Sequence, residues 1–177
     1  MNGNIYIRVF SIFLNMDVPQ IKPRAILISF DKFDDTAVSI VQKTPKPRLL
    51  WASRHVPLQI QREVLYEKGI RTIVQFSMKF ENAEQIVEIA RKCECEYVVP
   101  VLPLSMIARL VELAPKYGIT VLWAEMEQIK VLKTEPKAGV DYDPNIETYV
   151  ASPEGYKIMR FKKFWKLIKV ELVKEEV

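Results

Sequence analysis

The sequence predicts an α/β fold built on a parallel sheet of four core strands, with antiparallel β additions at both termini. Two observations carry this prediction: short apolar runs recur along the chain, and the segments between them have helical periodicity. Such alternation is typical of βαβ units, and the usual doubly wound start gives the strand order 2-1-3-4. The four strands are expected at residues 49–52, 71–76, 97–102 and 119–124.

The helices between these strands have recognisable ends. Asn82, with Gln85 three residues later, is a capping-box pattern that begins the second helix. The third helix is expected to begin at Pro103 or Ser105. Pro100 lies inside the third strand, where it removes a backbone donor, so we expect a bulge there or pairing on one side.

Three β-branched and aromatic runs before the core predict strands, at residues 4–14, 25–30 and 36–42. The polar stretch between the last two predicts that they form a hairpin. Pro45 and Pro47 follow, and two prolines so close together predict a stiff linker without regular structure. A boundary is therefore expected near residue 46.

The C-terminal part has the composition of a β-hairpin, with a turn at Ser152-Pro-Glu-Gly155. Residues 156–170 are expected to be mainly extended, with a helix as the open alternative. This stretch is basic and carries interleaved aromatic residues. We expect three regions: an N-terminal β extension (1–46), an α/β core (47–130), and a C-terminal loop with a basic β-hairpin packed on the core (131–177).

Composition and charge narrow the function classes. The chain has 177 residues, a net charge of +4 and two cysteines, Cys93 and Cys95. So few thiols and a single histidine do not supply a four-ligand zinc site, and we expect no metal and no cofactor. Neither a dinucleotide-binding fingerprint nor a P-loop can be read. With no run long enough to cross a membrane, we expect a soluble, cytoplasmic protein without a membrane partner.

Candidate site residues follow the predicted strands, since ligands of parallel sheets bind beyond the carboxyl ends of the strands. Arg54 offers a fork of donors that suits phosphate, and a histidine such as His55 can exchange protons near neutral pH. The alternative without a functional role is that the side chains of Arg54 and His55 are merely exposed on a loop. The candidates at these ends are Ser53, Arg54, His55, Ser77, Ser105 and Glu125.

Two stretches resemble a known family. Leu49-Leu-Trp-Ala-Ser-Arg-His55 and Val101-Leu-Pro-Leu-Ser-Met-Ile-Ala-Arg-Leu110 are similar to the small type III CRISPR accessory proteins of the SRH-motif ring-nuclease group. These are Rossmann-like proteins of antiviral defence that bind, and in some members cleave, cyclic oligoadenylates. Here Val56 lies between His55 and the proline that usually follows the histidine directly.

The resemblance implies a metal-independent ring nuclease, in which a ribose 2′-OH attacks the adjacent phosphate. His55 would be the general acid or base, and Arg54 would hold the scissile phosphate. The hydroxyls and carboxylate at the other strand ends (Ser53, Ser77, Ser105, Glu125) would bind the ligand. A cyclic, symmetric ligand also implies a homodimer.

Two other function classes stay open. The first is a nucleic-acid-binding protein of a mobile element, which would use the basic C-terminal segment with Arg160, Lys162, Lys163 and Lys166. The second is a non-catalytic structural or interaction protein that has no ligand. Lysines on an edge strand also discourage aggregation, so the basic segment by itself does not choose between them.

Overall fold

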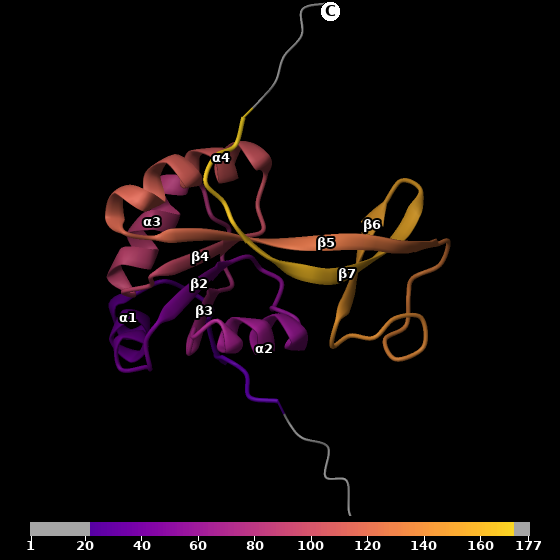
Figure 1. The fold of residues 1–177 in the computed structure, drawn as a ribbon, viewed down its shortest axis with the longest axis horizontal. Helices are drawn as coiled ribbons and strands as arrows, with labels where there is room; N and C mark the ends of the chain where they lie inside the picture. Colours follow the sequence, from indigo (N-terminus) through magenta and orange to yellow (C-terminus); the bar gives the residue numbers. More distant parts are fainter. Residues whose placement is uncertain (1–21, 172–177) are drawn as a thin grey trace, which may run out of the picture.

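The computed structural model describes residues 22–171, which form a mixed α/β fold around one curled sheet (Figure 1). Within this range there are seven strands, four α-helices and one short 3₁₀ helix, η1. In chain order the elements are β1 (Ile26–Phe30), α1 (Asp35–Gln42), β2 (Arg48–Ala52), α2 (Gln59–Glu67), β3 (Thr72–Phe76), α3 (Ala83–Lys92), β4 (Tyr97–Pro100), α4 (Leu104–Leu113), η1 (Ala114–Tyr117), β5 (Thr120–Leu132), β6 (Glu147–Ser152) and β7 (Gly155–Lys166).

The strand order of the sheet is β1-β3-β2-β4-β5-β7-β6. Strands β1 to β5 pair in parallel, whereas β5-β7-β6 is antiparallel. The complete sheet has seven strands and does not match the predicted four-stranded sheet of order 2-1-3-4. The strands it concerned lie side by side as β3-β2-β4-β5, but β1 extends the sheet beyond β3 and the hairpin extends it beyond β5.

The N-terminal prediction is wrong in two respects. Residues 36–42 belong to helix α1 rather than to a strand, and β1 joins the sheet parallel to β3 rather than as part of an antiparallel hairpin. Asp34 caps the helix, because its carboxylate accepts a hydrogen bond from the backbone N–H of Ala37 over 2.9 Å. Ala37 and Val41 then bury one helical face, so tertiary packing overrides the β propensity of Val38 and Ile40. The predicted strand at residues 4–14 lies outside the described residues.

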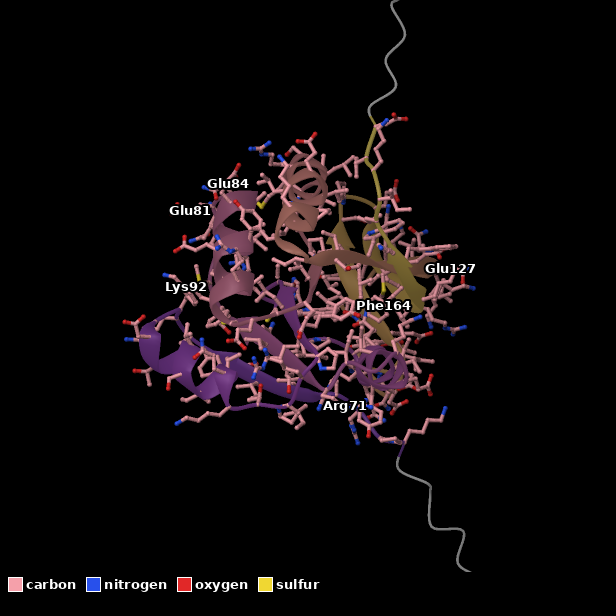
Figure 2. The ribbon with its side chains drawn as sticks, turned by 60° about the vertical axis from the view of Figure 1, so that its left-hand side comes forward. Arg71, Glu81, Glu84, Lys92, Glu127 and Phe164 are labelled. Carbon is pink, nitrogen blue, oxygen red and sulfur yellow. The ribbon has the colours of Figure 1, made fainter. Side chains whose placement is uncertain are left out.

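Alternating residues of the parallel strands fill two cores, as the two-residue period of a strand requires. Leu50, Val74 and Val98 face α1, α3 and α4, and Leu49, Ile73 and Val99 face α2. Figure 2 shows Glu81, Glu84 and Lys92 along the outer side of α3, and Phe164 between the antiparallel strands and α2. Burial on both faces explains why the core strands read as continuous apolar runs.

Strand β5 belongs to both parts of the sheet. Its first residues pair with β4 at Thr120 and Val121, and from Leu122 onward it pairs with β7. Pro100 at the end of β4 is in register with Ala52 of β2, while the pairing of β4 with β5 ends at Val98. The prediction of one-sided pairing at Pro100 is confirmed.

The C-terminal hairpin is also confirmed. Residues 155–166 are extended, and Ser152 pairs with Gly155 across the turn. Gly155 has a φ of 130°, and a β carbon there would collide with the carbonyl oxygen of Leu132. Strands β5, β7 and β6 form a ribbon, hereafter the C-terminal ribbon, that extends beyond the parallel sheet (Figure 1).

The side chain of Arg48 is buried, with 2% of its surface exposed. Its guanidinium donates to the carbonyl oxygen of Gln42 (2.6 Å), the last residue of α1, and to that of Thr44 (2.7 Å) just beyond the helix. It also donates to the carboxylate of Glu94 (3.2 Å) and the carbonyl of Cys93 (3.4 Å) at the end of α3. One cation thus neutralises the negative ends of two helices.

Candidate functional site

A pocket of about 460 Å³ opens where β4 and β5 separate at the carboxyl edge of the parallel sheet. Its size is in the range of small-molecule sites, roughly 300–1,000 Å³. One side comes from β2 and β4 with the residues that follow them, and the other from the C-terminal ribbon. The lining is mainly apolar and aromatic, and it includes Trp51, Val101, Leu102, Trp123, Met126, Tyr149 and Met159.

The turn after β2 forms one rim of this pocket and has a fixed backbone. The backbone N–H of His55 donates to the hydroxyl of Ser53 over 3.0 Å. The indole N–H of Trp51 donates to the carbonyl of His55 (2.7 Å), and the amide of Gln75 donates to the carbonyls of Ser53 (2.9 Å) and His55 (3.1 Å). Because Trp51 and Gln75 are buried, core residues set the geometry of the rim.

Ser53 and His55 are the predicted site residues that line the pocket. Ser53 is buried and uses its hydroxyl within the turn, whereas the side chain of His55 is exposed at the rim. Arg54 is exposed beside them, but it is not part of the lining found among the residues that the structure describes. Its side chain is therefore available to a group that extends out of the pocket.

The remaining candidates do not line the pocket among the described residues. Ser77 is exposed after β3, where its backbone N–H donates to the carbonyl of Phe30 over 2.8 Å. Ser105 is exposed in the first turn of α4, at the same edge of the sheet as the turn after β2. The carboxylate of Glu125 accepts the indole N–H of Trp165 over 2.6 Å.

The position of Glu125 differs from the expected one because β5 does not end at Ala124. It continues to Leu132, so Glu125 lies within the ribbon rather than beyond the end of a strand. The same extension brings Trp123 and Met126 to the pocket. The sequence did not indicate Trp123 and Met126, because the partner strand that extends β5 begins more than twenty residues after its end. It did not indicate Gln61 of α2 either.

The charges of the basic segment are largely paired. Lys157 contacts Glu154 (3.0 Å), Arg160 contacts Glu147 (2.6 Å), and Lys162 contacts Glu127 (2.9 Å). The Lys162 ammonium lowers the pKa of the Glu127 carboxyl through a hydrogen bond and its charge. Lys163 stacks over Trp165, with its ammonium 4.1 Å from the ring centre. The segment therefore presents less free positive charge than its composition indicates.

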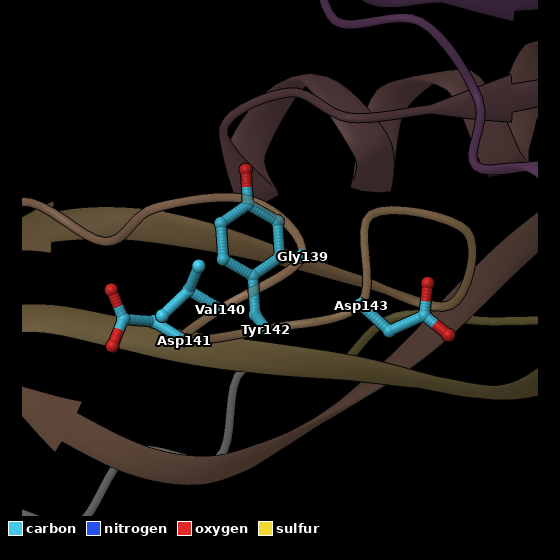
Figure 3. A pocket seen from close by; sticks show the side chains of 5 residues that line it. All are labelled: Gly139, Val140, Asp141, Tyr142 and Asp143. Carbon is cyan, nitrogen blue, oxygen red and sulfur yellow. The ribbon is translucent and has the colours of Figure 1, made fainter.

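A second hollow of about 330 Å³ lies in the loop before β6, lined by residues 139–143 (Figure 3). Asp141 and Asp143 extend to opposite sides of Tyr142. Asp141 accepts the backbone N–H of Lys137 and Asp143 that of Asn145, over 2.8 and 2.9 Å. These carboxylates organise the loop, and no cluster of three potential metal ligands occurs among residues 22–171.

Comparisons with family models, curated proteins and solved structures found no match to the chain. No helix within residues 22–171 is both long and apolar enough to cross a membrane. The function is therefore inferred from the chemistry of the pocket and its rim.

Proposed function

We propose that the protein binds a cyclic oligoadenylate, with an adenine base in the pocket between β4 and β5 and a phosphate at the turn formed by Ser53, Arg54 and His55. The observation that carries this proposal is the combination of an apolar, aromatic pocket with exposed Arg54 and His55 side chains at its rim. Aromatic and apolar walls suit a planar base, and the guanidinium suits the phosphate beside it.

Two positively charged features favour the binding of an anion at the carboxyl edge of the parallel sheet. Helix α4 begins next to the pocket after Pro103, a residue whose side chain provides no cap to the first turn. The N-terminus of a helix carries partial positive charge and attracts anions. Arg54 adds a full charge nearby on the neighbouring strand end. A ligand with a base in the pocket would thus find cationic groups on the side where its phosphates emerge.

The proposed cleavage needs no metal. The 2′-hydroxyl of a ribose attacks the adjacent phosphorus, the P–O5′ bond breaks, and the products are a 2′,3′-cyclic phosphate and a 5′-hydroxyl. The hydroxyl proton passes to a base and the leaving oxygen receives a proton from an acid, and His55 serves one of these transfers. Arg54 stabilises the charge that develops on the phosphate.

The nucleic-acid alternative receives less support, because Lys157, Arg160 and Lys162 are paired with carboxylates. It predicts RNA or DNA binding that weakens steeply with salt and is lost on combined Lys162, Lys163 and Lys166 substitution. If this behaviour is found and cyclic oligoadenylates do not bind, the ribbon rather than the pocket is the functional surface.

The proposal is tested with cyclic tri-, tetra-, penta- and hexa-adenylate, with cyclic di-AMP and linear AMP as controls. Binding is measured by thermal shift and calorimetry, and cleavage by mass spectrometry of the products. A ligand at a hundred times its dissociation constant should stabilise the fold by about 2.7 kcal/mol. No stabilisation by any cyclic oligoadenylate would overturn the proposed function. Sedimentation with and without ligand tests the proposed homodimer, because a two-fold ligand would join two pockets.

A further inference from the structure

The described lining of the pocket includes one buried side-chain amide whose N–H groups have only a weak acceptor. Gln61, the third residue of α2, lines the pocket and has 4% of its surface exposed. Its carboxamide oxygen accepts the backbone N–H of Leu58 over 2.8 Å, which satisfies the first turn of the helix. Its nitrogen contacts the thioether sulfur of Met126 at 3.8 Å.

This arrangement fixes the direction of the amide. Because the oxygen is held by Leu58, the NH₂ group must lie on the side of Met126, which is also a pocket residue. A carboxamide nitrogen has two N–H donors, and a thioether is a weak acceptor. The protein atoms described at residues 22–171 thus supply this NH₂ group with one weak partner. A buried amide without a good acceptor is unfavourable, so an acceptor on a ligand would be bound preferentially.

We infer that Gln61 determines specificity by donating a hydrogen bond to an acceptor atom on the planar ring of the ligand. This inference rests on the proposed function, since it names the ligand atom that the same pocket would recognise. The ligand class is a heteroaromatic base with an unprotonated ring nitrogen, such as N1, N3 or N7 of adenine. A site with a buried donor discriminates against a ring that lacks the acceptor, because the donor is then left unpaired.

The chain offers a substitution that separates the donor from the helix cap. In Gln61→Glu, a carboxylate oxygen can still accept the N–H of Leu58, but the NH₂ donor is gone. Gln128→Glu makes the same chemical change at an exposed residue of β5 and serves as the matched control. We expect Gln61→Glu to bind cyclic tetra-adenylate or cyclic hexa-adenylate at least about tenfold more weakly, and Gln128→Glu to bind like the parent.

The decisive measurement changes the ligand, so its first part needs only the parent protein. Cyclic tetra-adenylate and cyclic hexa-adenylate are each prepared with 1-deaza-, 3-deaza- or 7-deaza-adenine as the base. Each of these bases has C–H in place of one ring nitrogen of adenine. We expect one of the three analogues to bind the parent protein about tenfold more weakly, and this difference to vanish in Gln61→Glu.

The outcomes separate the two claims. If the parent protein binds neither cyclic tetra-adenylate nor cyclic hexa-adenylate, the inference fails. The proposed function fails as well if cyclic tri-adenylate and cyclic penta-adenylate do not bind either. If the parent binds the rings but all three deaza analogues bind equally well, the inference alone is overturned. It is also overturned if an analogue is discriminated equally by the parent and by Gln61→Glu, because another group then reads the nitrogen.

Discussion

The indole nitrogen of Trp51 donates a 2.7 Å hydrogen bond to the backbone carbonyl of His55. Trp51 packs in the core between the sheet and α2, and His55 lies at the rim of the pocket. The amide of Gln75 on the neighbouring strand β3 holds the same carbonyl. A change at Trp51 therefore alters the geometry of the rim as well as the lining of the pocket.

Replacing Trp51 by Phe should loosen this turn. The substitution removes the N–H and part of a buried ring, so we expect the free energy of unfolding to fall by about 1–3 kcal/mol. Affinity for the ligand should fall as well. Urea unfolding and calorimetry provide the measurements. Trp165→Phe is the control, because that indole donates to Glu125 on the exposed ribbon, and its cost should stay below about 1 kcal/mol. Equal costs for the two variants would show that the Trp51 bond is not special.

Arg54 and His55 should have separable effects. Loss of a charge-assisted hydrogen bond to phosphate in Arg54→Ala costs about 1.5–3 kcal/mol, which is roughly tenfold to a hundredfold in affinity. His55→Ala should slow cleavage while changing the dissociation constant by less than about threefold. Arg91→Ala, at an exposed position near the end of α3, is the matched control. An Arg54→Ala protein that binds and cleaves like its parent would remove Arg54 from the site.

Arg48 should be among the most sensitive positions for stability. Its removal in Arg48→Met leaves the carbonyls of Gln42 and Thr44 without their buried donor, so we expect a loss of roughly 3 kcal/mol. The measurement is chemical denaturation. Arg71→Met provides the comparison, because this arginine donates to Tyr66 at the partly exposed surface, and its loss should cost about 1 kcal/mol. If Arg48→Met lowers the free energy of unfolding by less than about 1 kcal/mol, the role assigned to Arg48 is wrong.

Glu147 should contribute a pH-dependent stability. Its carboxylate accepts the backbone N–H of Asp143 over 2.9 Å and pairs with Arg160, and these contacts lower its pKa below the usual value of 4.5. A carboxyl whose pKa is lowered by folding stabilises the protein fully above its unfolded pKa, and this contribution is lost as the pH falls through the folded value.

The stability difference between the parent and Glu147→Gln should therefore be largest near neutral pH and shrink below about pH 4.5. Urea titrations at several pH values measure it. Glu112→Gln alters a surface pair with Arg109 and is the control, with an expected effect below about 1 kcal/mol. A difference between the parent and Glu147→Gln that stays constant down to pH 3 would refute the assignment.

The sequence predicted much of the hydrophobic core but few of the residues that line the pocket. The apolar runs at 49–52 and 97–100 identify β2 and β4 because strands buried on both faces have no polar alternation. Helix α1 was missed because its β-branched residues outweighed the cap at Asp34 and the i, i+4 spacing of Ala37 and Val41.

The pocket depends on pairing between distant segments. The length of β5 is set by its antiparallel partner, since Leu122 pairs with Lys166 and Leu132 with Tyr156. Without that register, the sequence does not indicate that Met126 and Met159 meet residues following β2 and β4. Ser53 and His55 were found because they directly follow a recognisable buried strand, which is a local signal.

The continuity of β5 gives the molecule the geometry of a lever. Its fulcrum is the point where the strand leaves β4, after Val121, and the pocket lies in the angle between the two. From Leu122 to Leu132 the ribbon extends roughly 33 Å. A rotation of about 5° at the fulcrum displaces the far end by about 3 Å over that length. A small displacement of β5 beside Pro100 would therefore be larger at the Ser152–Gly155 turn, at the far end of the ribbon.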